Sequence, residues 1–242
     1  LYLDSQNYLV NLNGEFKLAN NKIRYANLNS KFQNGEKFLF SITSTSNNET
    51  ITKLNADRAK PFVSNYKFIK GFQDGVIDFH SVKKNNVSKS VLKIHNFKVR
   101  EVPVLAQLLT LASLQGIADS LTGEGIRFTD FEMIFSNEND LMTIEEMYSI
   151  GPAISILMEG YAVRNKLISL RGTLVPAKTI NRTIASIPVI GDILVGKKVG
   201  EGVFGVSFKI KGPPKDLKTT VNPVKTLTPR FITRTLEKLK KD

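Results

Sequence analysis

The sequence predicts a mainly β protein with a few short helices, in which antiparallel strands follow one another along the chain. Apolar and polar residues alternate with a period of two in many segments, as they do in strands buried on one face. Asn-rich turn signals lie between these segments, at Asn13-Gly14, Asn20-Asn21, Asn34-Gly35, Asn47-Asn48, Asn85-Asn86 and residues 137–140. Helical periodicity is rare, so the pattern favours a meander of hairpins.

The predicted strands are located by their apolar positions. The first clear strand covers residues 37–46, where Phe38, Phe40 and Ile42 alternate with polar neighbours. Another begins with Ile126 and Phe128, and its phase slips at Thr129-Asp130, as a β-bulge would cause. The positions that continue this strand and define the later ones are Phe131, Met133 and Phe135; Ile154 and Ile156; Ile168, Leu170 and Leu174; and Phe204, Val206, Phe208 and Ile210.

Four helices are expected between or after the strands. The first covers residues 57–66 and is limited by Pro61, and the third covers residues 178–186. The second, residues 104–112, is apolar on nearly every side but too short to cross a bilayer, so we expect it to plug or cap an apolar region. The fourth begins at Pro229 after the N-cap Thr228 and is amphipathic and basic.

Composition and charge limit the classes of function. The 242 residues include 34 Lys and Arg, 22 Asp and Glu and no Cys, which gives a net charge of +12 and excludes disulfides, thiolate metal sites and thiol catalysis. Residues 197–242 carry eight of these net positive charges, whereas residues 119–146 have a net charge of −7. No RNA-binding strand signature or zinc-finger spacing accompanies the basic end, so nucleic acid is not a predicted partner.

Motifs that would indicate an enzyme or a cofactor are weak, and we expect no catalytic residue, metal or cofactor. The segment from Gly200 to Gly205 matches G-x-G-x-x-G but leads into a predicted strand, whereas a dinucleotide site needs a helix there. His80 and His95 lie in strand-like runs without acidic neighbours at ligand spacing, which favours ordinary solvent-facing strand residues. No window is long and apolar enough for a membrane-spanning helix.

The order of short motifs in the second half of the chain carries a family resemblance. The motifs are Gly123-Glu124-Gly125, Gly172-Thr173-Leu174-Val175-Pro176-Ala177, Ile187-Pro188-Val189-Ile190-Gly191-Asp192-Ile193-Leu194 and Val221-Asn222-Pro223. Together with Gly160, Asn181 and Pro229, they resemble the C-terminal region of the AsmA-like family of bacterial envelope proteins, in its YhdP/TamB-like group. Residues 215–218 depart from the family pattern, which usually has a proline before the last strand.

The resemblance implies a bridge-like lipid transfer protein, in which a curved antiparallel sheet forms an open, apolar-lined groove. It divides the chain into a β-groove segment at residues 1–101 and an AsmA-like region with capping helices at residues 102–242. The chain would belong to a longer periplasmic protein that is anchored in the inner membrane and carries phospholipid to the outer membrane. Because the sequence opens at Leu1 with strand-like residues, we expect a piece of a longer protein or a processed product.

The residues expected to line the groove are the alternating apolar positions of the second half, since Phe and Met suit a mobile apolar ligand. They are Phe128, Phe131, Met133, Phe135, Ile154, Ile156, Ile168, Leu170, Leu174, Phe204, Val206, Phe208 and Ile210. Without the resemblance, the same alternation also fits the core of a β-sandwich or a closed barrel.

The C-terminal helix has a separate predicted role. Arg230, Phe231, Arg234 and Lys238 would contact the outer-membrane surface or an outer-membrane protein, and the alternative is a helix packed on the sheet with a solvated basic side. For the whole chain, the alternative function is an envelope scaffold that assists the assembly or secretion of outer-membrane proteins.

Overall fold

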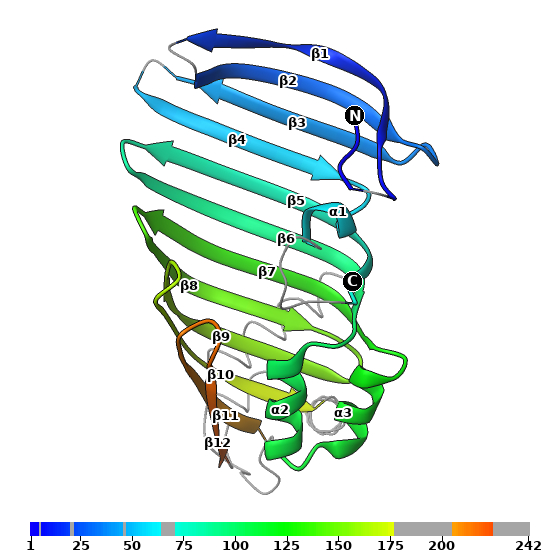
Figure 1. Cartoon of the computed structure of the whole chain (residues 1–242), viewed down its shortest axis with the longest axis vertical. Helices are drawn as coiled ribbons and strands as arrows, with labels where there is room; N and C mark the ends of the chain where they lie inside the picture. The colour runs from blue at the N-terminus through cyan, green and yellow to red at the C-terminus, as the bar shows by residue number, and fades with distance from the viewer. Residues whose placement is uncertain (5, 20–21, 46, 64–70, 177–204, 225–242) are drawn as a thin grey trace, which may run out of the picture.

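The computed structural model describes residues 1–4, 6–19, 22–45, 47–63, 71–176 and 205–224. Within these ranges, twelve strands form one antiparallel sheet in which each strand pairs with the next along the chain, and the sheet is not closed (Figure 1). The strands are β1 (Leu9–Ala19), β2 (Lys22–Phe32), β3 (Lys37–Ser44), β4 (Glu49–Ala56), β5 (Gln73–Lys84), β6 (Val87–Val99), β7 (Ile126–Glu138), β8 (Leu141–Ile150), β9 (Ile154–Val163), β10 (Leu167–Pro176), β11 (Gly205–Gly212) and β12 (Lys218–Val224). The predicted meander of hairpins is therefore confirmed for these residues.

Three helices lie in the connections of the described chain. α1 (Lys60–Val63) follows β4, whereas α2 (Pro103–Leu111) and α3 (Gln115–Thr122) both lie between β6 and β7. α2 confirms the apolar helix expected at residues 104–112. α1 begins at Lys60 and not at residue 57, because the backbone N–H groups of Asp57 and Ala59 still bond to carbonyls of neighbouring strand segments. The expected end of this helix, residues 64–66, lies outside the described residues. The sequence did not predict α3, and the helices expected at residues 178–186 and from Pro229 lie outside the described residues.

One predicted turn is wrong. Asn13-Gly14 lies inside β1, where Gly14 pairs with Leu28 at a φ of 148°. A Cβ at this position would lie 2.0 Å from the carbonyl oxygen of Asn27, so the glycine allows close approach of two strands rather than a reversal of the chain. The hairpin turn is placed as predicted at Asn34-Gly35, where Gly35 has a φ of 90°.

The predicted phase slip in β7 is confirmed. The pairing of β6 with β7 runs to His95↔Asp130 and resumes at Phe97↔Phe128 in the same register, so the slip is not the expected β-bulge. One residue is skipped in each strand, Thr129 in β7 and Asn96 in β6, and Asn96 has a φ of 53°. In a regular strand, Phe128 and Phe131 would lie on opposite faces. Here both rings contact the ring of Phe97, so the irregularity keeps both on one face of the sheet.

The buried core lies at one end of the strands, on the face against which α2 and α3 pack. We call this side of the sheet the helix face. Leu105, Leu108 and Leu109 of α2 and Leu121 of α3 belong to one buried cluster with apolar residues from nearly every strand. α2 also contacts β12, so the helix face curves around α2 (Figure 1). The opposite ends of the strands, at the hairpin tips, extend away from the helices (Figure 1).

An aromatic stack is the centre of this core. The ring of Phe97 lies between those of Phe72 and Phe128, with centroids 5.3 and 5.4 Å away, and the ring of Phe131 meets it edge to face. The stack joins β6, β7 and the residue directly before β5. It lies where the chain leaves β6 to enter α2 and where it enters β7 after α3. Aromatic pairs in this geometry add stabilisation beyond the buried area.

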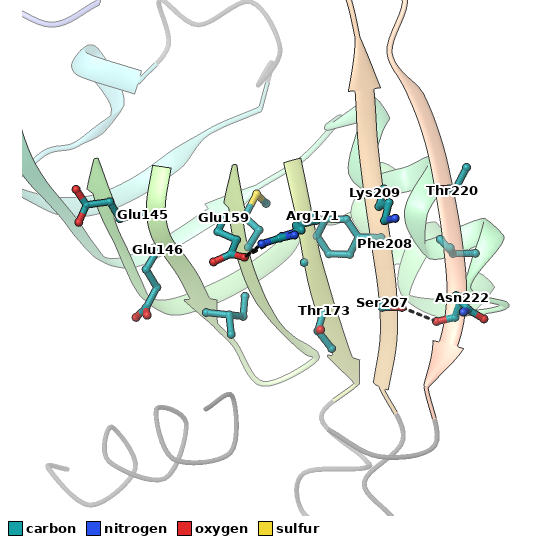
Figure 2. A pocket seen from close by; sticks show the side chains of 14 residues that line it. Glu145, Glu146, Glu159, Arg171, Thr173, Ser207, Phe208, Lys209, Thr220 and Asn222 are labelled. Carbon is teal, nitrogen blue, oxygen red and sulfur yellow. Dashed lines mark hydrogen bonds and ion pairs between the residues drawn. The ribbon is translucent and has the colours of Figure 1, made fainter. Parts of the chain in front are cut away.

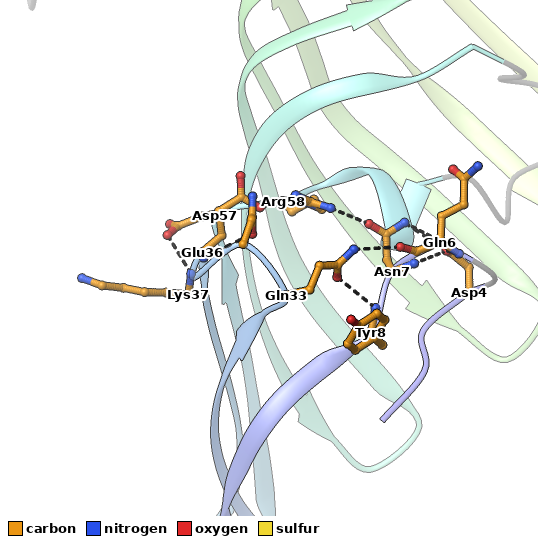
Figure 3. Close-up of polar contacts among 10 residues, drawn as sticks. Asp4, Gln6, Asn7, Tyr8, Gln33, Glu36, Lys37, Asp57 and Arg58 are labelled. Atoms are coloured by element: carbon orange, nitrogen blue, oxygen red, sulfur yellow. Dashed lines mark hydrogen bonds and ion pairs between the residues drawn. The ribbon is translucent and has the colours of Figure 1, made fainter.

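A polar cluster holds the N-terminal segment against the same strand ends (Figure 3). The guanidinium of Arg58 donates to Glu36 Oε2 at 2.7 Å and to Oδ1 of the buried Asn7 at 2.8 Å, and the Asn7 amide donates to Asp4 Oδ2 at 2.8 Å. Partial burial raises the pKa of Asp4. Hydrogen bonds from the backbone N–H of Gln6 and from Asn7 outweigh this effect and hold the pKa below its ordinary value.

We predict that Phe97→Ala lowers the free energy of unfolding by about 3–5 kcal/mol, because it removes the central ring of the stack and leaves a cavity. Chemical denaturation of both proteins measures the difference. Phe16→Ala is the control, since Phe16 is 63% exposed, and it should change stability by less than about 0.5 kcal/mol. Equal losses in the two variants would contradict the placement of the core.

We predict that Asp4 contributes stability that is lost in acid. Its pKa is lowered in the folded chain, so the contribution is complete above the ordinary pKa of 3.8 and disappears as the pH falls through the lower folded value. The difference in unfolding free energy between the wild type and Asp4→Asn should be below about 1 kcal/mol, because Asp4 is only half-buried, and it should shrink as the pH is lowered from 7 to 2. A difference that stays constant over this range would contradict the assignment.

Candidate functional site

A line of apolar residues crosses the helix face from β2 to β12, and we call it the central row. Each of its residues pairs directly with the next across the strands, in the order Leu28, Phe40, Leu54, Phe79, Leu92, Met133, Met147, Met158, Gly172, Phe208 and Val221. At about 4.8 Å between strands, ten steps give a line roughly 48 Å long. All of these residues except Phe208 are half-buried.

Parallel rows lie on either side of the central row on the same face. Toward the helices, the inner row consists of Phe38, Ala56, Ile77, Ile94, Phe131, Ser149, Ile156, Leu174 and Val206. Toward the hairpin tips, the outer row consists of Ile42, Thr52, Ser81, Ser90, Phe135, Ile144, Gly160, Leu170, Ile210 and Thr219. The inner row is mostly buried in the core, so the helices cover that part of the helix face.

A fourth row, the tip row, lies next to the hairpins. It contains Ser44, Thr50, Lys83, Ser88, Asn137, Met142, Ala162, Ile168 and Gly212. The four rows together contain no Asp or Glu, and Lys83 is their one charged residue.

The structure places the predicted lining residues together on the helix face. Those in β7, β9, β10 and β11 all lie on this side of the sheet, whereas Phe204, Arg230, Phe231, Arg234 and Lys238 lie outside the described residues. Many of them are core residues: Phe128, Ile154 and Leu174 are at most 3% exposed. Phe131, Met133, Ile168 and Leu170 are half-buried and so border the solvent.

The sequence did not lead us to the residues that β2–β6 contribute to these rows. We noted the alternation of Phe38, Phe40 and Ile42 but assigned these residues no role. The same alternation in Ile77 and Phe79 and in Leu92 and Ile94 was a signal that could have identified the other strands. Met147 was harder to identify, because the register of β8 shifts between Ile144 and Met147. Met158 continues the alternation of Ile154 and Ile156 in β9 and could have been identified from it.

The opposite face of the sheet is polar and rich in ion pairs. Lys93 Nζ lies 3.4 Å from Glu132 Oε2, and Arg171 Nη2 lies 2.7 Å from Glu159 Oε1. The half-buried His95 also lies on this face, with Nδ1 2.9 Å from Asp130 Oδ1. Exposed charged pairs of this kind contribute little stability each, but they keep this face compatible with water.

A shallow hollow of about 600 Å³ lies over the polar face of β8–β12 (Figure 2). Arg171 and Glu159 face each other at its centre, and Ser207, Lys209 and Asn222 lie at its side. Glu145, Glu146 and Lys209 also line the hollow, so three carboxylates face two cations, and Arg171 and Glu159 pair with each other. The hollow therefore presents little net charge to a ligand. The helix face is therefore the stronger candidate site.

Two kinds of site are absent from the described residues. No group of three or more His, Asp or Glu side chains is close enough there to hold a metal ion. No helix among the described residues is long and apolar enough to cross a membrane.

Comparison of the chain with models of protein families, with curated proteins and with solved structures gave no match.

Proposed function

We propose that this chain is a non-enzymatic phospholipid conduit, in which the helix face lines a groove that covers acyl chains. In the cell, it would be part of a longer periplasmic protein that is anchored in the inner membrane of a Gram-negative bacterium and carries phospholipid between the two membranes. The central row is the observation that carries this proposal. The motifs that resemble the AsmA-like family give the cellular setting.

The energetics of acyl chains explain why such a row would be useful. Exposing a buried CH₂ group to water costs about 0.8 kcal/mol, so two chains of ordinary length cost on the order of 20 kcal/mol. A line roughly 48 Å long exceeds the length of one extended acyl chain, and it runs across strands without a charged interruption. A lipid could therefore move along the sheet while its chains stay covered.

The composition of the row also favours a mobile ligand. Its middle consists of Met133, Met147 and Met158, whose unbranched side chains adapt their shape to what they contact. None of the residues in the row carries a polar side chain that would hold a lipid in one place. Because these side chains are only half-buried, part of their apolar surface remains accessible to a ligand.

We predict that the triple variant Leu92→Gln, Met133→Gln and Met158→Gln co-purifies with much less phospholipid than the wild type, by about tenfold or more. The three amides would have to be buried against acyl chains without hydrogen-bond partners. Native mass spectrometry of the gently purified 242-residue chain, with extraction and identification of bound lipid, measures the effect.

The matched control variant changes the neighbouring residues on the same three strands. Val91, Ile134 and Leu157 are also half-buried but lie on the polar face, so changing all three to Gln should leave lipid binding within about twofold. Wild-type protein that carries no phospholipid would overturn the proposed function. Equal loss in the two triple variants would contradict the assignment to the helix face.

An envelope scaffold is the second candidate, and strand β1 favours it. β1 is an edge of the sheet in the described chain, and its residues Leu12, Phe16 and Leu18 are exposed. Exposed apolar edge strands can pair with a strand of another protein.

The scaffold candidate predicts that a photo-crosslinking residue at Phe16 captures a specific outer-membrane protein in cells, because that side chain would lie in the new interface. The control places the same photo-crosslinking residue at position 55, because Asn55 is exposed on the polar face of β4. A survey that yields no adduct specific to position 16 would count against the scaffold.

A further inference from the structure

Lys83 stands out on the helix face because of the residues around it. In the tip row it pairs directly with Thr50 of β4 on one side and with Ser88 of β6 on the other. In the outer row, one step toward the helices on the same three strands, lie Thr52, Ser81 and Ser90. Five hydroxyl-bearing residues therefore occupy the positions next to Lys83 on this face.

The same three strands change from apolar to polar along their length. Leu54, Phe79 and Leu92 form their share of the central row, the hydroxyls follow in the outer row, and the cation stands in the tip row. Lys83 is four positions after Phe79, which corresponds to about 13 Å along a strand. Charge, hydrogen-bonding groups and apolar surface thus succeed each other in the order found in a phospholipid molecule.

Among the described residues, no carboxylate on the helix face forms an ion pair with this cation. The neighbouring Lys84 points to the opposite face, where its Nζ lies 3.2 Å from Glu49 Oε1. The four rows on the helix face contain no carboxylate, as described above. Ser90 is 4% exposed and donates from Oγ to Ser81 Oγ at 2.9 Å, which orders the hydroxyl row behind Lys83.

The strands further along the sheet do not repeat this arrangement. In β8–β10, the outer and tip rows remain apolar, with Ile144, Leu170, Met142 and Ile168. The change to hydroxyls and then to a cation is confined to β4–β6, so it is a local feature and not a property of every hairpin tip.

We propose that Lys83 and the surrounding hydroxyls bind the phosphodiester of an anionic glycerophospholipid, whose acyl chains then extend over the central row toward the helices. This proposal rests on the proposed function and adds the orientation and the class of the lipid. An ammonium group and hydroxyl donors are suitable partners for a phosphate oxygen, since hydrogen bonds to an ionised group are the stronger kind. The strands β4–β6 would hold the headgroup, whereas β8–β10 would contact chains alone.

The test compares two lipids that differ in the phosphate-bearing headgroup. Phosphatidylglycerol and diacylglycerol, both with the same fluorescent acyl chain, are titrated against the full 242-residue chain. Lys83→Glu should weaken phosphatidylglycerol binding by about tenfold and change diacylglycerol binding by less than twofold, whereas Lys83→Arg should retain wild-type binding. Lys83 is exposed, so these variants should unfold at the wild-type denaturant midpoint.

Lys89→Glu is the matched control, because Lys89 is exposed on the polar face of the same hairpin. It makes the same change in charge and should leave the binding of both lipids unchanged. Equal effects of Lys83→Glu and Lys89→Glu, or equal weakening of the two lipids by Lys83→Glu, would overturn the headgroup assignment. Competition by millimolar inorganic phosphate would overturn it in favour of a free-anion site.

The two proposals fail in different ways in this experiment. Wild-type protein that binds neither lipid would overturn the proposed function and the headgroup site together. Wild-type protein that binds both lipids, with no dependence on Lys83, would overturn the headgroup site alone and support the conduit.

Discussion

The packing of two short helices against one end of a wide sheet is the interaction on which the rest of the structure depends. An antiparallel sheet with one apolar face must cover that face, and here α2 and α3 cover it near the inner row, around the stack of Phe97 and Phe128. At the other end of the inner row, Phe62 of α1 stacks on Phe38 of β3. This asymmetry gives each strand a buried end and a projecting end. The partly covered central row and the isolated Lys83 both lie on the projecting part of the helix face.

A single consistent register makes the rows possible. Because side chains alternate between faces, a slip of one residue in any pair would move that strand's apolar set to the polar face. The local irregularities of the strands do not exchange the apolar and polar faces. At Asn96 and Thr129 both strands change phase together, and in β8 the shift between Ile144 and Met147 returns Met147 to the central row beside Met133. The irregularities therefore preserve the division into two faces.

The sequence was informative about features that are local in the chain. The alternation of Phe38, Phe40 and Ile42 predicted β3, and the phase slip in β7 could be read from the spacing between Phe128 and Phe131. It failed where a residue's role depends on a distant strand: Asn13-Gly14 has the composition of a turn, but Gly14 is placed by its contact with Asn27. For the same reason, the sequence did not distinguish Lys83 from the other lysines. Only the register of the sheet shows that Thr50 and Ser88 lie beside it.

The difference between β4–β6 and β8–β10 bears on the choice between a conduit and a scaffold. A sheet that contacts other proteins only through its edge needs an exposed apolar strand such as β1. It does not need a face that changes from apolar to charged along its central strands. On β4–β6, apolar residues, hydroxyls and one cation follow each other over a few residues, whereas on β8–β10 the apolar surface extends to the tips. A molecule with a polar end and long apolar chains can match the first region with its headgroup and the second with its chains alone. This match between the gradient and an amphiphile supports the conduit, because a protein partner at β1 would not contact either region.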